Sequence, residues 1–219
     1  MIQTETRVRC PHCNQEVSTA EFCPKCGKIL PIPETESFYE VLGYDREFLV
    51  LDLADLEKRF FELSKKFHPD RFASKSPLEV QVSHDRSSAI NNAYRTLKNP
   101  ITRAKYFVEK ELGSVEEKSA TVPMDMADLF FEVQDVLDTI RESNGNPPES
   151  AVKEVENAER DLKEKTKELE KRLESTFSEY DASPTKETLE KMKGILSERS
   201  YIKSFLRQVD SVMKGEEGS

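Results

Sequence analysis

Residues 56–72 of the chain read Leu-Glu-Lys-Arg-Phe-Phe-Glu-Leu-Ser-Lys-Lys-Phe-His-Pro-Asp-Arg-Phe. Apolar side chains recur in this stretch at spacings of three and four, at Leu56, Phe60, Leu63 and Phe67. That spacing predicts a helix with one buried stripe. Because a proline disfavours helical geometry in the residue before it, Pro69 should end this helix and hold His68 and Asp70 on an exposed loop.

The sequence on both sides of this loop predicts further helices. Ser37 is followed three residues later by a carboxylate, an N-cap pattern that opens a short helix ended by Gly43. Asp52 or Asp55 can cap the helix that leads to the loop. A later helix, over about 78–97, should lie antiparallel to it. The outward face of the helix before the loop is basic, with Lys58, Arg59, Lys65 and Lys66.

This arrangement resembles the J-domain of DnaJ-type co-chaperones in Tyr39, Leu42-Gly43, the basic helix, His-Pro-Asp and the run Ala89-Ile90-Asn91-Asn92-Ala93-Tyr94-Arg95-Thr96-Leu97. The resemblance implies docking onto the ATPase domain of a DnaK-type heat-shock chaperone, where His-Pro-Asp stimulates ATP hydrolysis. The implied contact residues are Lys58, Arg59, Lys65, Lys66, His68, Pro69, Asp70 and Arg71. An enzyme is the alternative, but His68 and Asp70 have no serine or cysteine nucleophile near them. We therefore expect a protein that is not an enzyme.

All four cysteines lie near the start of the chain, as Cys10-Pro11-His12-Cys13 and Cys23-Pro24-Lys25-Cys26. Two Cys-x-x-Cys pairs can place four thiolates around one tetrahedral ion, so we predict a structural Zn²⁺ held by Cys10, Cys13, Cys23 and Cys26. Iron accepts the same ligands and is the alternative metal. The start of the sequence has no signal-peptide pattern, and a reducing compartment disfavours disulfides. Because so few residues surround the site, hydrophobic burial alone cannot fold the module, and metal binding should provide its folding free energy.

The sequence after Leu97 adds a second resemblance. Pro100 starts a helix that contains Arg103-Ala104 and Tyr106, and Phe72 follows the loop. Together these residues resemble the HscB/Jac family, the J-proteins of iron-sulfur cluster biogenesis, some of which carry an amino-terminal four-cysteine module. The resemblance covers nearly the whole chain. It implies that a carboxyl-terminal helical bundle binds the scaffold protein on which the cluster is built.

Three amphipathic helices are predicted in the remaining sequence, over about 125–141, 152–177 and 189–209, and short turns should fold them into an antiparallel bundle. The middle helix could instead form a coiled coil, although the prolines on both sides favour folding back in cis. The family resemblance implies scaffold contacts at Leu129, Phe130, Phe131, Glu132, Asp135 and Tyr201. Phe130 and Phe131 cannot both face the core, because adjacent helical residues lie about 100° apart. Bacterial relatives tend to have an arginine between two acidic residues late in this motif, where this chain has Val136-Leu137-Asp138.

Composition agrees with an all-α fold: a small four-cysteine zinc module, then a helical-hairpin J-domain, then a three-helix bundle. Of 219 residues, 34% are charged and only 7 are glycine, which is typical of long solvated helices. We predict domains at 1–33, 36–112 and 122–215. The net charge of -9 arises after residue 110, where the chain has 16 basic and 26 acidic residues. The acidic carboxyl-terminal half repels phosphate groups, so nucleic acid is not an expected partner.

No apolar run approaches the roughly 20 residues of a membrane span, so we expect a soluble protein, cytoplasmic, or in the mitochondrial matrix if eukaryotic, and a monomer or weak dimer. The expected function is a co-chaperone that binds an iron-sulfur scaffold, delivers it to a DnaK/HscA-type chaperone and stimulates its ATPase. Two alternatives remain at this point. One is a general J-domain recruitment factor for another client, and the other is an iron-binding redox or iron-delivery protein that uses the four cysteines.

Overall fold

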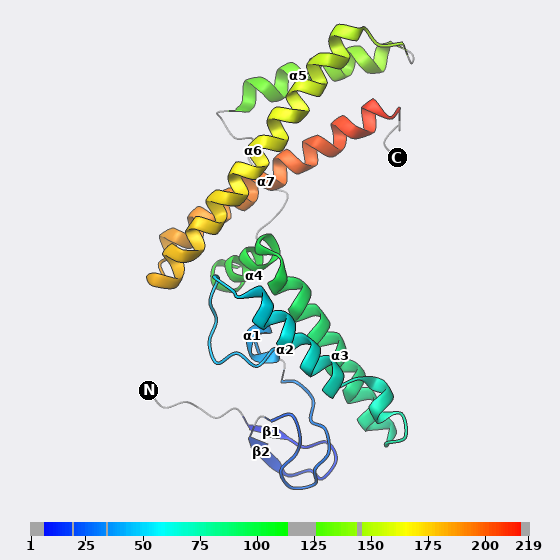
Figure 1. Ribbon diagram of the computed structural model, residues 1–219, viewed down its shortest axis with the longest axis vertical. Helices are drawn as coiled ribbons and strands as arrows, with labels where there is room; N and C mark the ends of the chain where they lie inside the picture. Colours follow the sequence, from blue (N-terminus) through cyan, green and yellow to red (C-terminus); the bar gives the residue numbers. More distant parts are fainter. Residues whose placement is uncertain (1–6, 19, 34, 114–125, 144–145, 216–219) are drawn as a thin grey trace. The chain divides into compact units, whose positions relative to one another are not determined.

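The computed structural model describes residues 7–18, 20–33, 35–113, 126–143 and 146–215. These form two compact units, residues 1–103 and 104–219, which are considered separately. The described residues contain seven α-helices and a short two-stranded sheet, which confirms the predicted all-α class (Figure 1). Several predicted features lie outside the described residues. They are the start of the zinc module at residues 1–6, Glu34 of the linker, the bundle boundary at 122, the start of the first bundle helix at Asp125 and the break at 144–145. Our three domain boundaries stay predictions.

The first unit begins with the cysteine module. Strands β1 (Arg7–Arg9) and β2 (Glu16–Ser18) pair antiparallel, with Val8 opposite Val17. The small core of the module consists of Cys10, Val17, Cys23 and Leu30. A core of this size provides little hydrophobic free energy of folding.

The helices of the first unit begin and end where the sequence predicted. Helix α1 (Phe38–Val41) has a capping box between Ser37 and Glu40. Asp52 caps α2 (Leu53–Lys66) through the backbone amides of Ala54 and Asp55. The His-Pro-Asp segment is more ordered than the predicted loop, because residues Pro69–Phe72 form a 3₁₀ turn, η1. Helix α3 (Pro77–Lys98) then runs back along α2 (Figure 1).

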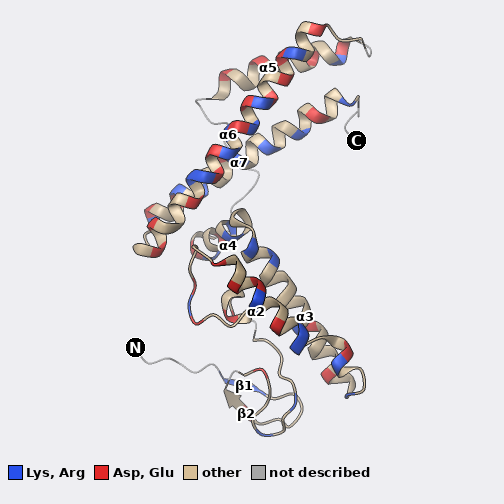
Figure 2. Ribbon diagram, viewed as in Figure 1, with Lys and Arg blue, Asp and Glu red and all other residues tan. Residues whose placement is uncertain are grey.

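The second unit begins within helix α4 (Pro100–Leu112) and contains the predicted helical bundle. Its helices are α5 (Ala127–Glu142), α6 (Glu149–Ala182) and α7 (Lys186–Met213). Helix α6 packs against both α5 and α7 of its own chain. The middle helix therefore folds back within the bundle, as the flanking prolines favoured, and does not extend as a coiled coil. Figure 2 shows acidic and basic residues interspersed along α6 and α7. Among the described helices, none is both long and apolar enough to cross a membrane.

Candidate functional site

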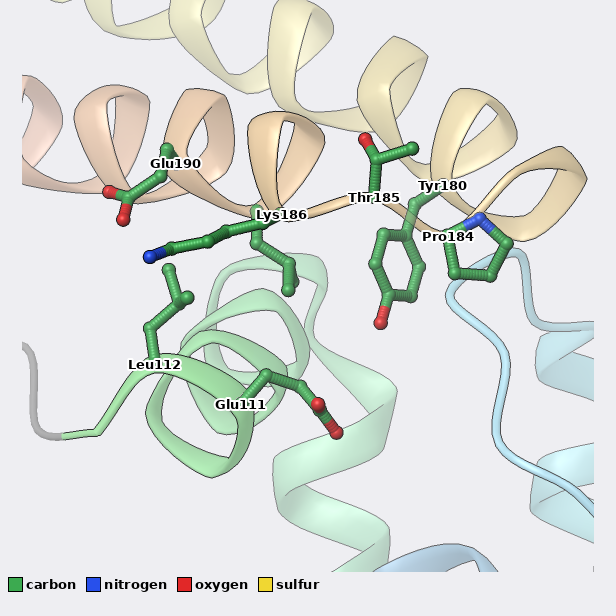
Figure 3. A pocket seen from close by; sticks show the side chains of 8 residues that line it. Glu111, Leu112, Tyr180, Pro184, Thr185, Lys186 and Glu190 are labelled. Atoms are coloured by element: carbon green, nitrogen blue, oxygen red, sulfur yellow. The ribbon is translucent and has the colours of Figure 1, made fainter.

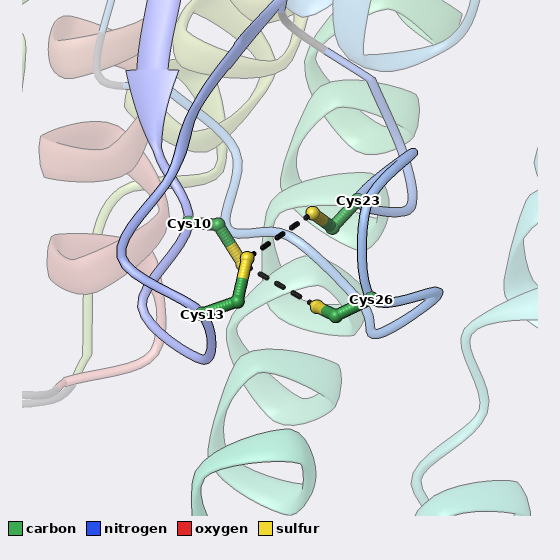
Figure 4. A group of neighbouring side chains, drawn as sticks. All are labelled: Cys10, Cys13, Cys23 and Cys26. Atoms are coloured by element: carbon green, nitrogen blue, oxygen red, sulfur yellow. Dashed lines mark hydrogen bonds between the residues drawn. The ribbon is translucent and has the colours of Figure 1, made fainter.

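The four cysteine sulfurs lie together, as the two Cys-x-x-Cys pairs predicted. The Sγ atoms of Cys10 and Cys26 are 3.8 Å apart, as are those of Cys13 and Cys23, and all four lie within 4.8 Å of one another (Figure 4). A tetrahedron with metal–sulfur distances of about 2.3 Å has edges of about 3.8 Å. None of the four is in a disulfide. The donor set and its dimensions therefore fit a single tetrahedral metal ion.

The two cysteine pairs are held by equivalent turns. The amide of Asn14 donates to the carbonyl of Cys10, and the amide of Gly27 donates to the carbonyl of Cys23. Asn14 and Gly27 both have positive φ, a conformation that these two residue types tolerate best. Burial raises the pKa of the Cys23 thiol, but hydrogen bonds from the backbone amides of Cys26 and Lys25 lower it to about 7. The backbone thus favours thiolate at this position.

The His-Pro-Asp segment is accessible at the end of α2. The side chain of Asp70 is 90% exposed and that of His68 57%, and the His68 ring nitrogen Nδ1 lies 3.5 Å from the Asp70 carboxylate. The backbone amide of Asp70 also donates to His68 Nδ1, at 3.3 Å. Pro69 between them is half-buried, and the Arg71 guanidinium donates back to the carbonyl of Lys65. A hydrogen-bonded turn therefore presents one carboxylate and one imidazole to solvent.

The four basic residues predicted on the outer face of α2 are not equivalent. The side chains of Lys58 and Lys65 are exposed and form no ion pair with any residue that the structure describes. Lys66 forms an ion pair with Glu21 of the cysteine module. Two free lysines, rather than four basic groups, therefore remain to attract an acidic surface.

Arg59, the fourth basic residue, is held within the first unit. It donates to the carboxylate of Asp55 at 2.8 Å and to the carbonyl of Gly43 at 2.6 Å, and its guanidinium lies 4.2 Å from the centre of the Tyr44 ring. The hydrogen bond from Arg59 lowers the pKa of Asp55. These contacts join α2 to the loop after α1, so Arg59 has a structural function in the helical hairpin.

Phe61 is a surface residue that the sequence reasoning did not single out. Its side chain is 61% exposed, whereas the neighbouring Phe60 stacks on Tyr94 with ring centres 4.0 Å apart. Residues 58, 61 and 65 lie on one face of a helix, so Phe61 stands between the two free lysines. Adjacent helical residues lie about 100° apart, so the pair Phe60-Phe61, like Phe130-Phe131, indicates one exposed phenylalanine.

The predicted scaffold residues of the bundle divide into a buried and an exposed set. Phe130 is 5% exposed, and its ring packs edge-on against Tyr201 and Phe205 of α7, at 4.7 and 4.8 Å. Phe131 points the other way and is 71% exposed. Tyr201 is half-buried. The structure thus brings the aromatic residues of α5 and α7 together, with Phe131 as the exposed one.

The polar members of the same site lie on the outer side of α5. Glu132 and Asp135 are exposed, and Leu129 beside them is half-buried. Asp138 is already paired with Arg141, at 2.5 Å, and accepts a hydrogen bond from Gln134. Glu132 and Asp135 therefore have no ion-pair partner among the described residues.

A pocket of about 500 Å³ lies elsewhere in the second unit, where the end of α4 meets the turn between α6 and α7 (Figure 3). Its lining residues are Glu111, Leu112, Tyr180, Pro184, Thr185, Lys186, Leu189 and Glu190. None of them belongs to the site residues that the sequence predicted. The pocket is therefore separate from the candidate sites.

Comparisons with known proteins give the same family at several levels. The DnaJ domain family model matches residues 37–106. The human iron-sulfur cluster co-chaperone protein HscB is 30% identical over 78% of this chain and 69% of its own length. A co-chaperone protein HscB homolog from Aliivibrio salmonicida is 35% identical over 63% of this chain and 80% of its own.

Solved structures agree on the fold of nearly the whole chain. The crystal structure of human co-chaperone protein HscB matches 95% of this chain and 98% of its own, with a TM-score of 0.69 and 22% identity. Chaperone HscB from Vibrio cholerae matches 83% of this chain and 100% of its own, with a TM-score of 0.57 and 18% identity. The DnaJ domain match and the identity to HscB proteins show that this chain belongs to the HscB family of co-chaperones.

Proposed function

We propose that this protein binds an iron-sulfur cluster scaffold protein, delivers it to a DnaK/HscA-type chaperone and stimulates the ATPase of that chaperone. The observation that carries the proposal is the exposed His68-Pro69-Asp70 turn at the end of a helix with two free lysines. The test is the steady-state ATPase rate of the chaperone, which should rise with this protein and rise further when the scaffold is added. The scaffold is proposed as the client because of the HscB relatives. We propose that the protein acts where the scaffold is, in the cytoplasm or the mitochondrial matrix. We also propose that it is a monomer or a weak dimer.

Binding to the chaperone uses the lysine charges for association and the His-Pro-Asp turn for ATPase stimulation. Lys58 and Lys65 attract an acidic face of the ATPase domain and bring the helix into register, with Phe61 between them as an apolar contact. The turn then places the Asp70 carboxylate and the His68 imidazole against the partner. Because η1 orders the backbone of this segment, docking costs less backbone conformational entropy than it would from an open loop.

The scaffold side uses the bundle face of α5. Phe131 is a large exposed aromatic ring, which is the type of residue that dominates binding free energy when a partner buries it. Glu132 and Asp135 beside it favour a basic patch on the scaffold. Holding the client and the chaperone on one chain makes their encounter effectively intramolecular, which raises the local concentration of client.

Charge reversal at one free lysine tests the steering role. In Lys65→Glu, the rate of association with the chaperone should fall about three- to tenfold at low salt, and its dependence on salt should weaken. Stopped-flow binding at several salt concentrations measures both. Lys167→Glu, an exposed lysine on α6, is the matched control and should leave the rate unchanged. Equal effects of the two substitutions would mean that only net charge matters.

The metal centre is proposed to hold structural Zn²⁺, which would supply the folding free energy of the module. Purified protein should contain one zinc per chain and be colourless, and Cys23→Ser should lower the zinc content and unfold the module, because a buried ligand is lost. Elemental analysis and absorption spectra measure this. A red, reducible site in the purified protein would instead support the iron-binding alternative.

A further inference from the structure

Arg86 of α3 is a buried cation whose hydrogen bonds leave the J-domain helices and end in the cysteine module. The residue is 7% exposed. Its Nε donates to the carbonyl of Leu30, and its Nη2 donates to the carbonyl of Ala20 at 3.3 Å. The guanidinium also lies over the ring of Phe67, 4.8 Å from the ring centre. One side chain thus joins the module, α3 and the end of α2.

The charge of Arg86 is stabilised mainly by the two backbone carbonyls and the Phe67 ring. Burial lowers its pKa, and Glu36 and Glu21 oppose this shift through longer-range attraction. No carboxylate of the described residues lies within ion-pair distance of it. If the two carbonyls moved away, a buried guanidinium would lose its acceptors, which is among the costlier losses in a protein interior.

Leu30 connects the carbonyl that accepts from Arg86 to the core around the cysteines. The side chain of Leu30 belongs to the same small core as Cys10, Val17 and Cys23. Without the metal, the thiolates no longer hold this core together, and the backbone that faces Arg86 loses its support. The position of the acceptors therefore depends on the occupancy of the cysteine site.

Further contacts connect the module to the same end of the helical hairpin. The rings of Phe22 and Phe67 stack with centres 5.7 Å apart. Glu21 forms an ion pair with Lys66, and Lys28 lies 3.8 Å from Glu79 at the start of α3. The module therefore covers the last turn of α2 and the first turn of α3.

The covered end is the one that carries His-Pro-Asp. Phe67 directly precedes His68, is fully buried, and its carbonyl accepts a hydrogen bond from Ser83 at 3.0 Å. Its ring contacts both Arg86 and Phe22. Removing the module would expose this ring and leave the last turn of α2, next to the turn η1, with fewer contacts.

We propose that the metal-loaded module is a clamp on the His-Pro-Asp end of the J-domain, with Arg86 as the positioning residue that joins the two. Loss of the metal releases the clamp and loosens the turn. Through the proposed function, on which this consequence rests, metal loss then lowers stimulation of the chaperone ATPase while the J-domain helices remain. The cysteine module is thereby a metal-dependent control on the co-chaperone.

Hydrogen exchange on the full chain tests the clamp without an ATPase assay. The zinc-loaded protein, the same protein after chelation and zinc-loaded Arg86→Met are compared by mass spectrometry. We expect amides of residues 63–72 to exchange about tenfold faster after chelation and in Arg86→Met, because both remove the same support. Arg95→Met, an exposed arginine on the same helix, is the control and should exchange like wild type. Circular dichroism checks that helices α2 and α3 persist.

The outcomes separate the clamp from the proposed function. If chelation unfolds the module and exchange in residues 63–72 stays the same, the clamp is wrong. If Arg86→Met does not fold, the chelation arm on the wild-type protein still decides. If the zinc-loaded protein does not stimulate any DnaK-type ATPase, the proposed function is wrong, and the exchange comparison still confirms or overturns the clamp. Stimulation that falls on chelation in parallel with faster exchange supports both.

Discussion

A protein carrying Asp70→Asn should lose its stimulation of the chaperone ATPase and bind the scaffold with unchanged affinity. The substitution keeps the size of the side chain and removes its charge, at a carboxylate that is 90% exposed and pairs only loosely with His68. An exposed group of this kind contributes little to the free energy of unfolding. The rate of ATP hydrolysis, measured with saturating variant, should therefore fall to the basal rate of the chaperone, while the melting temperature stays within the error of the wild type.

The control for this substitution is Asp45→Asn, which removes an exposed carboxylate from the loop before α2. It should stimulate the ATPase like the wild-type protein. If Asp70→Asn stimulates as well as Asp45→Asn does, the His-Pro-Asp turn does not act as proposed. If both lose stimulation, the effect comes from the net charge of the J-domain rather than from the turn.

Truncating the two adjacent phenylalanines of α5 should produce opposite results. Phe131→Ala removes an exposed ring, so we expect the dissociation constant for the scaffold to rise about thirtyfold, with the free energy of unfolding nearly unchanged. Phe130→Ala removes a ring buried against Tyr201 and Phe205 and should lower the free energy of unfolding of the bundle by about 3–5 kcal/mol. Isothermal titration calorimetry and denaturant unfolding measure the two quantities.

Phe61→Ala is the matched control for the calorimetry, because it removes a similarly exposed phenylalanine from the J-domain. It should bind the scaffold like wild type. A scaffold affinity that Phe131→Ala leaves unchanged would place the client on another face of the bundle. A loss of affinity shared with Phe61→Ala would indicate a general effect of removing exposed aromatic surface.

Local signals were sufficient to predict the helices. Capping residues Ser37 and Asp52 mark helix starts, and Pro69 marks the end of α2, because each acts on neighbouring backbone. The cysteine site was predictable for a similar reason, since the spacing within each pair fixes the geometry of its turn. The adjacent pair Phe130-Phe131 showed that the two rings cannot both face the core, but the choice between them depends on where α7 lies.

Contacts between distant segments could not be read from the sequence. Arg86 lies on a helix with the polar neighbours His84 and Asp85, and nothing in that stretch shows that its acceptors are 56 and 66 residues away. Lys66 was predicted on the basic face that meets the chaperone, and the sequence did not show that Glu21 of the cysteine module pairs with it. Both differences have one cause: the packing of the module on the helical hairpin is set by tertiary contacts, which local periodicity does not encode.

In the proposed mechanism, one chain holds the scaffold and the chaperone at the same time. The most direct test measures scaffold-dependent ATPase stimulation with an equimolar mixture of Asp70→Asn and Phe131→Ala, at scaffold concentrations below the dissociation constant of the second variant. One variant keeps the client surface and the other keeps the turn, so the mixture contains every function on separate molecules. The bivalent mechanism predicts that the mixture gives no more stimulation with scaffold than without it. Restoration of the wild-type rate would contradict it.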